Sequence, residues 1–262
     1  RSSDLDTLTA IAEDKSHVIT GEQKCVYFAE QEPEVLEVLQ RRAETLHIPY
    51  KIYGRDFHAE NIRYTCFGMQ FDVEIGDNIY ADLQIPLLGE HQAKNCALAL
   101  AVCVDVLSDL RRESAVFSLP DIRKNLSLLH WPGRMEVLRS KPFVLLDACI
   151  NATSCENVKE VLRHLGVWNC TVIVGIPEDK DYAGVVRSMK GMANRIILTR
   201  SGNPHYHFSQ KQQETLAEED IGTIWTDSVK QALTLAGSCP DPIVILGTTS
   251  VISEVEQIFQ QS

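Results

Sequence analysis

The second half of the chain alternates short apolar runs with amphipathic stretches, which predicts strands followed by helices. The apolar runs are rich in β-branched residues and cover 143–150, 171–176, 195–200, 223–226 and 242–247. Apolar residues recur every three or four positions, as on one face of a helix, over 154–166, 181–192, 208–219, 227–237 and 250–260. Alternating strands and helices form right-handed crossovers, so we expect a mostly parallel sheet covered by helices on both faces.

The first half has a different pattern. Its predicted helices cover 5–15, 33–46, 90–110 and 121–129. Its predicted antiparallel strands cover 50–57, 62–75 and 78–86. Gly76-Asp77-Asn78 is suited to a hairpin turn between the last two strands. The helix over 90–110 is apolar nearly all round, which predicts that it is buried.

A polar segment separates the two patterns. Leu138-Arg139-Ser140-Lys141-Pro142 is interrupted by proline, which is typical of a connection between domains. We therefore expect one domain over 1–137 and a second over 138–262. The chain shows no internal repeat and no low-complexity tract.

Composition and charge exclude several classes of protein. The 262 residues are 44% hydrophobic and 23% charged, as in globular proteins and unlike disordered chains. The formal net charge of −11 would repel a phosphate backbone or an anionic membrane surface, so we expect no nucleic-acid or membrane partner. No run of about 18 apolar residues and no signal-peptide core is present, which favours a cytoplasmic location.

Cysteine and histidine spacing gives no metal motif. The eight cysteines include no Cys-x-x-Cys and several lie in apolar segments, so we expect buried free thiols instead of zinc sites or disulfides. His205 and His207 are two residues apart, but no third ligand lies near them in the sequence. The sequence therefore does not favour a metal site there.

Two segments carry candidate chemistry. In Trp131-Pro132-Gly133-Arg134-Met135-Glu136 a rigid turn presents a guanidinium, whose planar set of donors suits phosphate. An apolar strand then ends at Asp147, near Asn151 and Ser154. A carboxylate at the carboxyl end of a strand is placed to accept hydrogen bonds from a ribose. Together these residues predict half of a nucleotide site.

Five segments, in order, carry a resemblance to a known family. They are Ile11-Ala12-Glu13-Asp14-Lys15, Gly89-Glu90-His91-Gln92-Ala93-Lys94-Asn95, Trp131 to Glu136, Asp147 to Ser154, and Asp179-Lys180-Asp181. They resemble motifs of the folylpolyglutamate synthase and dihydrofolate synthase family of Mur-type ATP-dependent ligases. The resemblance spans nearly the whole chain. It implies an α/β protein with a partial Mur-ligase-type central ATPase domain followed by a Rossmann-like C-terminal domain.

The resemblance also implies an activity. In this family ATP converts a carboxylate to an acyl phosphate, which the amino group of an amino acid then displaces to form an amide. Positioned cations stabilise the phosphoryl group during transfer. ATP and Mg²⁺ would be the cofactors, and folate and glutamate the small-molecule substrates.

The resemblance assigns roles to individual residues. Arg134 would contact the ATP phosphates and Asp147 the ribose. Asn95 would meet the adenine edge, and His91 would hold the linker near the nucleotide. The lysine matching Lys15 is carbamylated in the family and provides an oxygen ligand for magnesium. The residues that would contact substrates are Asn151, Ser154, Asp179 and Lys180.

Each of these residues also has a structural interpretation. Arg134 could form an interdomain salt bridge, and Asp147 could cap the helix predicted near Ser154, a role that Ser154 itself would fill better. Lys15 could be a solvated lysine at the carboxyl end of a helix. The remaining candidates could cap or begin helices; they are His91, Asn95 and Asp179 to Asp181.

The chain departs from the family pattern in two respects. The phosphate-binding loop Gly-x-x-x-x-Gly-Lys-Ser/Thr is absent from the 262 residues, so we expect a further N-terminal segment to complete the ATPase domain. Ile150 stands where the family has a histidine, and an alkyl group cannot replace a hydrogen bond from imidazole. Ala148, Ala152 and Ser16-His17-Val18 also differ from the family motifs.

Three functions fit these observations. The first is an ATP-dependent ligase that joins glutamate to folate, with this chain alone inactive because the loop is missing. The second is a diverged, inactive ligase-like binding or scaffold protein, which Ile150 favours. The third is a Mur-type ligase with a different acceptor. A nicotinamide oxidoreductase ranks below these, because no Gly-x-Gly-x-x-Gly follows a predicted strand.

Overall fold

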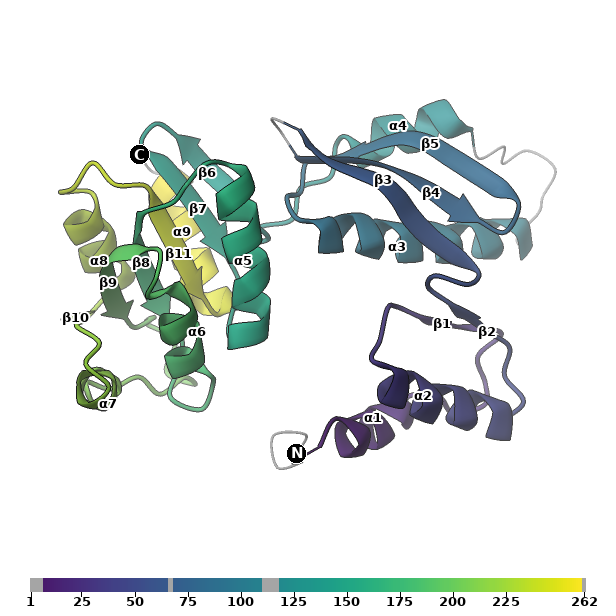
Figure 1. Cartoon of the computed structure of the whole chain (residues 1–262), viewed down its shortest axis with the longest axis horizontal. Coiled ribbons are helices and arrows are strands. Elements are labelled where there is room, and N and C mark those ends of the chain that lie inside the picture. Colours follow the sequence, from purple (N-terminus) through teal and green to yellow (C-terminus); the bar gives the residue numbers. More distant parts are fainter. Residues whose placement is uncertain (1–6, 66–67, 110–117, 261–262) are drawn as a thin grey trace. The chain divides into compact units, whose positions relative to one another are not determined.

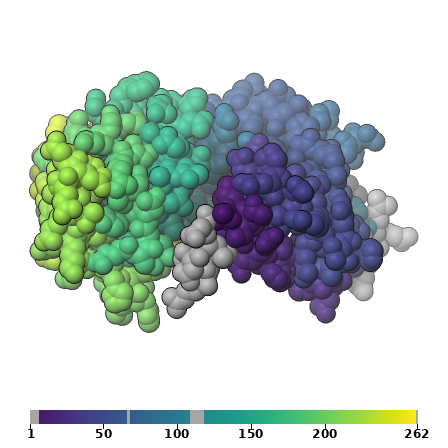
Figure 2. All heavy atoms as spheres, turned by 60° about the horizontal axis from the view of Figure 1, so that its bottom comes forward, coloured from purple at the N-terminus to yellow at the C-terminus, as the bar shows by residue number. Residues whose placement is uncertain are grey.

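The computed structural model describes residues 7–65, 68–109 and 118–260; the others are drawn in grey in Figures 1 and 2. The described residues form two compact units. The first contains 7–65, 69–85, 90–109 and 118–128, and the second contains 68, 86–89 and 129–260. No helix in these ranges has both the length and the apolar character needed to cross a membrane.

The second unit is built on a six-stranded sheet in the order β10-β9-β8-β11-β7-β6 (Figure 1). The strands are β6 (Glu136–Ser140), β7 (Phe143–Asp147), β8 (Cys170–Gly175), β9 (Ala193–Thr199), β10 (Ile224–Thr226) and β11 (Ile243–Gly247). Neighbouring strands from β10 to β7 are parallel, and β6 is antiparallel to β7. The predicted mostly parallel sheet is therefore confirmed.

Helices cover both faces of this sheet. They are α5 (Ala152–His164), α6 (Tyr182–Met189), α7 (Lys211–Glu218), α8 (Val229–Ala236) and α9 (Thr249–Gln260). Because side chains alternate along a strand, Ile173 and Ile245 pack with α8 and α9, whereas Val172 and Val244 point to the opposite face, where α5 and α6 lie (Figure 1). Both sets are buried, which explains why the strands are apolar throughout.

The segment that was expected to connect two domains is part of this sheet. Residues 136–140 form β6, and Ser140 pairs with Phe143 of β7. Residues 129–137 therefore group with the second unit in the structure. The division into domains at residue 138 stays a prediction.

The first unit contains two small sheets. In one, β1 (Val26–Phe28) is parallel to β2 (Tyr50–Ile52). The other has the order β3 (Phe57–Thr65), β4 (Gly68–Ile75) and β5 (Asn78–Ile85). The helices of this unit are α1 (Leu8–Ser16), α2 (Pro33–Thr45), α3 (Glu90–Asp109) and α4 (Leu119–Leu126). Helices α1 and α2 contact each other, α3 contacts β3, and α4 contacts β5.

Two strand predictions for this unit are wrong. Residues 50–57 are not one antiparallel strand, because 50–52 form β2 in parallel pairing with β1 and Phe57 begins β3. Residues 62–75 are divided between β3 and β4, with 66 and 67 outside the described part. Period-two alternation does not distinguish parallel from antiparallel strands or reveal a tight reversal. The hairpin at Gly76 is confirmed, since Ile75 pairs with Asn78 and Gly76 has a φ of 56°.

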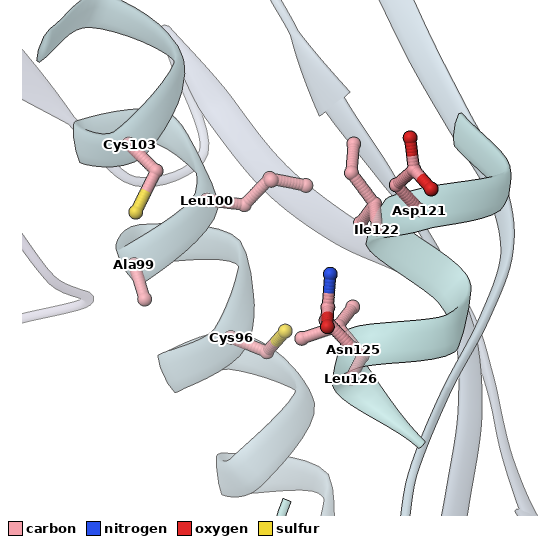
Figure 3. A pocket seen from close by; sticks show the side chains of 8 residues that line it. All are labelled: Cys96, Ala99, Leu100, Cys103, Asp121, Ile122, Asn125 and Leu126. Atoms are coloured by element: carbon pink, nitrogen blue, oxygen red, sulfur yellow. The ribbon is translucent and has the colours of Figure 1, made fainter. Parts of the chain in front are cut away.

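Helix α3 is buried on one side only, so the expectation of burial all round is wrong. Ala97 and Ala101 are fully buried, whereas Asn95, Cys103 and Val106 are exposed in the chain as described. Figure 3 shows α3 facing α4 across a cavity of about 190 Å³, which Leu100 and Ile122 help to line. Small alanines let α3 lie close to the sheet, and this contact fixes the buried stripe.

A glycine packs directly against α9. Gly133 has a φ of 62°, and a Cβ atom built there would lie 2.5 Å from Cγ2 of Ile252. Gly166 offers a matched control, because its φ is 72° but a Cβ atom would meet nothing within 4 Å. The backbone conformation favours glycine at both positions, but only at Gly133 is there also no space for a Cβ atom.

We expect Gly133→Ala to lower the free energy of unfolding by about 3 kcal/mol, because backbone strain and overpacking add. Gly166→Ala should cost about 1 kcal/mol, from backbone strain alone. Denaturant unfolding of both variants, and of Gly133→Ala combined with Ile252→Ala, measures the two effects. Equal losses at the two glycines, or strict additivity with Ile252→Ala, would contradict the contact.

Candidate functional site

The turn before β6 has a fixed backbone that leaves one guanidinium exposed. Gly133 N–H donates to Oε2 of Glu136 at 2.8 Å, and Arg134 N–H donates to the Trp131 carbonyl at 3.3 Å. Met135 has a φ of 47° and is buried. These contacts direct the Met135 side chain into the protein and leave the Arg134 side chain exposed.

The end of β7 holds this turn at two points. Met135 N–H donates to Oδ2 of Asp147 at 2.9 Å, and Ala148 N–H donates to the Gly133 carbonyl at 2.8 Å. Asp147 is only 6% exposed, so its carboxylate lies inside the protein beneath the turn. The structure thereby gives Asp147 a positioning contact. The predicted contact with a ribose stays a prediction.

Burial dominates the ionisation of Asp147. Loss of hydration raises its pKa from 3.8 to about 6, although the N–H groups of Met135 and Cys149 and the charge of Arg134 act in the opposite direction. When Asp147 is deprotonated, its negative charge interacts with the positive charge of Arg134. The group titrates near neutral pH, in a range where ligand binding and protonation can be coupled.

Arg134 lines a cavity of about 670 Å³ within the second unit. The wall includes the aromatic rings of Trp131 and Phe143 and the guanidinium groups of Arg134 and Arg139. Pro86 to Leu88 line another side of this cavity. Aromatic surface beside guanidinium donors suits a ligand that has a planar ring and anionic groups. Asp147 is not among the residues that line it.

Asn151 and Ser154 stabilise the amino end of α5. Asn151 is the N-cap, and its Oδ1 accepts from Ser154 N–H at 2.8 Å. The Ser154 hydroxyl donates to the same residue and lies 3.3 Å from Sγ of Cys149. The helix begins at Ala152, two residues before the predicted start, and the expectation that Ser154 caps it is wrong. The backbone of Asn151 is extended just before the helix starts at Ala152. Its side chain can therefore turn back and accept from the free N–H group of Ser154 in the first turn.

Asp181 joins the amino ends of two helices, a role that the sequence did not reveal. Its Oδ2 accepts from Ala152 N–H and its Oδ1 from Gly184 N–H, both at 2.9 Å. The carboxylate therefore caps α6 and also contacts the first residue of α5. An acidic residue at the start of a helix was the available signal, but the contact with α5 depends on the sheet order.

The neighbouring residues Asp179 and Lys180 are exposed. Lys180 Nζ lies 3.1 Å from Oδ2 of Asp179, and their side chains are 42% and 66% exposed. They occupy the loop between β8 and α6, at the carboxyl edge of the parallel sheet. This edge is where ligands bind in open α/β sheets. Their substrate role stays a prediction.

Three candidate residues lie in the first unit. Lys15 is in the last turn of α1, with Nζ 3.5 Å from Oδ2 of Asp14 and 61% of its side chain exposed. His91 and Asn95 lie in the first two turns of α3, and Asn95 Nδ2 is 3.5 Å from Oε1 of Gln92. Their predicted roles are untested by these contacts.

The cysteines agree in part with the sequence analysis. Seven are described and all are free thiols, while Cys66 lies outside the described residues. Cys96, Cys149, Cys155 and Cys170 are buried, but Cys103 is exposed, so burial was wrongly expected there. Burial raises the pKa of Cys96 to about 12, which keeps that thiol protonated. In the described ranges, His205 and His207 belong to no group of three metal-ligating side chains.

Comparison with known proteins assigns the class. The Mur ligase middle domain matches residues 4–103. The described fold also superposes on the crystal structure of Mycobacterium tuberculosis folylpolyglutamate synthase complexed with ADP and AMPPCP, with a TM-score of 0.84 and 22% identity. That match covers 98% of this chain and 62% of the other. The fold is thus that of Mur-type ligases.

Sequence relatives define the family more narrowly. Folylpolyglutamate synthase of Lacticaseibacillus casei is 26% identical over 96% of this chain and 57% of its own length. Dihydrofolate synthase/folylpolyglutamate synthase of Bacillus subtilis is 24% identical over 96% of this chain and 58% of its own length. The chain is similar to folylpolyglutamate synthases over nearly its whole length, and it spans slightly more than half the length of these relatives.

Asp147 generates a prediction about pH. Its folded-state pKa of about 6 lies above the ordinary value of 3.8. The stabilisation from this carboxyl group is therefore fully present below pH 3.8 and is lost as the pH rises through 6. Two pKa units correspond to about 3 kcal/mol.

We expect the difference in the free energy of unfolding between Asp147→Asn and wild type to shift in favour of the variant by about 2 kcal/mol between pH 4 and pH 7. Denaturant unfolding at several pH values measures this difference. Asp179→Asn, on an exposed loop, is the matched control for the replacement of a carboxyl group by an amide. A constant difference between Asp147→Asn and wild type across the pH range would rule out the proposed titration.

Proposed function

We propose that this chain is the nucleotide-handling part of an ATP-dependent ligase that joins glutamate to folate through an acyl phosphate. The observation that carries the proposal is the Pro-Gly-Arg turn, which presents Arg134 at a cavity while β7 holds its backbone. A guanidinium fixed in this way can stabilise charge on a transferring phosphoryl group without first being ordered. The named activities of the relatives support this proposal.

In the proposed reaction, Arg134 contacts the phosphates and Asp147 keeps the backbone of the turn in place. The exposed ring of Trp131, on the wall of the same cavity, offers a surface for the base or for the pterin ring of a folate. Asp147 would reach a ribose only through the oxygen that Met135 does not use. This arrangement makes Arg134 the binding group and Asp147 primarily a positioning residue.

The other predicted residues receive complementary roles in the proposal. Asn151 and Ser154 place the amino end of α5, and Asp179 and Lys180 the loop before α6, at the edge where an incoming glutamate would bind. Helix amino ends favour carboxylates. In the first unit, His91 and Asn95 at the start of α3 would approach the adenine. The family architecture would divide the chain at residue 138.

Magnesium does not fit the described form of Lys15. An ammonium group carries protons and no lone pair, and its present partner is the Asp14 carboxylate. Only conversion to a carbamate would give this side chain the oxygen atoms that magnesium prefers. The proposed function therefore depends on Lys15 only in its carbamylated form.

Ile150 supports a second candidate, an inactive ligase-like binding protein. It is half-buried two residues before the α5 helix begins, and it replaces an imidazole with an alkyl group. A site that depended on that histidine would lose a hydrogen bond to the amino acid. Such a protein would bind nucleotide through Arg134 but would not form an amide bond.

We expect Arg134→Gln to weaken binding of ADP by roughly tenfold to a hundredfold, because a charge-assisted hydrogen bond is lost. Calorimetric titration of the 262-residue chain measures this effect. Arg163→Gln, at an exposed position in the last turn of α5, is the matched charge control and should bind as wild type does. Equal affinity of Arg134→Gln and wild type would remove the phosphate role.

The amide-bond step needs a separate test. The full open reading frame that encodes this chain is expressed, and glutamylated folate is measured by mass spectrometry with ATP, folate and glutamate present. Glutamate-dependent product supports the ligase. Nucleotide binding without product favours the inactive alternative. In that case, formation of glutamylated folate by Ile150→His would show that the missing imidazole is responsible.

A further inference from the structure

Three side chains that can bind metals converge on the β3–β4 hairpin, in the first unit. His58 and Glu60 are two residues apart on β3 and therefore point to the same face. Glu74 lies on the neighbouring strand β4, next to His58. Figure 1 shows the two strands side by side. In the described ranges, these three residues form a group whose metal-ligating atoms all lie within 4.8 Å of one another.

The side chains occupy the polar face of the sheet. Along β4, Met69, Phe71 and Val73 are buried, while Asp72 and Glu74 alternate with them and are partly exposed. The buried face is apolar, so the polar side chains are available on the opposite face. The side chains of His58 and Glu74 are 35% and 34% exposed, which reduces screening by solvent compared with a fully exposed pair.

The distances suit a small cation. Nε2 of His58 lies 3.6 Å from Oε2 of Glu74. A ligand atom from each of the three residues lies within 4.8 Å of the other two. Ligands about 2.1 Å from a tetrahedral zinc ion stand roughly 3.4 Å apart, so one edge of such a site is already close to its required length.

The charges of the group also favour a cation. Glu60 and Glu74 lie on neighbouring strands with their ligand atoms within 4.8 Å of each other, so their like charges repel. In the described part of the chain, the Glu60 side chain makes no hydrogen bond or ion pair, and the single imidazole of His58 faces two carboxylates. The nearby Asp72 differs, because its carboxylate accepts from Asn61 Nδ2 at 2.8 Å and from Asp82 N–H at 2.7 Å.

We propose that His58, Glu60 and Glu74 bind one divalent transition-metal ion of the zinc type, with water as the fourth ligand. Imidazole together with carboxylates suits zinc and its neighbours, whereas magnesium and calcium prefer oxygen ligands alone. The ion would join β3 to β4 and stabilise the hairpin. This site shares no residue with the proposed nucleotide site, so either proposal can fail without the other.

The test uses cobalt(II) as a spectroscopic probe and zinc(II) in calorimetry, with the whole chain and reduced thiols. Cobalt at the proposed site gives visible d–d absorption without the thiolate charge-transfer band that cysteine ligands would produce. We expect one zinc ion per chain and an increase in the thermal unfolding midpoint when zinc is added. Because each ligand contributes directly, His58→Gln and Glu60→Gln should each weaken binding at least tenfold.

His207→Gln is the matched control, since it removes an exposed imidazole from a loop of the second unit. Its zinc affinity and its cobalt spectrum should equal those of wild type. Circular dichroism of the metal-free variants separates loss of binding from loss of folding, and Glu60→Gln serves if His58→Gln does not fold. Unchanged affinity in a folded His58→Gln or Glu60→Gln, a thiolate band, or no binding by wild type would overturn the proposal.

Discussion

The hydrogen bond from Met135 N–H to the buried carboxylate of Asp147 is the contact on which the candidate site depends. It joins a turn to the last residue of β7, the strand next to the edge strand β6, and the bond from Ala148 N–H to the Gly133 carbonyl adds a second point of attachment. Arg134 lies between these attachments in the sequence, so its backbone is fixed while its side chain remains exposed. Asp147 is costly to bury, and the backbone donors around it offset part of that cost.

The sheet supplies the rigidity behind this contact. Strand β7 lies between β6 and β11, and its residues Val144 to Leu146 are fully buried. Glycines let the surrounding elements approach closely, since a Cβ atom at Gly133 would clash with α9 and one at Gly247 would lie 2.8 Å from the Gly175 carbonyl. Close packing on both faces prevents the strand from shifting. The turn that it holds is positioned accordingly.

The helix amino ends at the carboxyl edge follow from the same sheet order. Asp181 reaches both α5 and α6 because these two helices contact each other, on a sheet in which only β11 separates the strands that precede them. In the β3–β4 hairpin of the first unit, side chains alternate between a buried face and a partly exposed face. There one face is apolar and packed, while the other gathers His58, Glu60 and Glu74. Both sites arise where strand geometry brings separate polar residues together.

The sequence predicts the alternation of strands and helices in the second unit, the hairpin at Gly76 and the resemblance to a known ligase family, because these depend on local periodicity and short motifs. It did not determine the parallel pairing of β1 with β2, the one-sided burial of α3 or the double role of Asp181. Strand pairing and the buried face of a helix depend on contacts between residues far apart in sequence, so local sequence patterns do not predict them. Arg134 and Asp147 could be named from their motifs, but their division of roles depends on the folded chain, in which the carboxylate holds the turn while the guanidinium remains exposed.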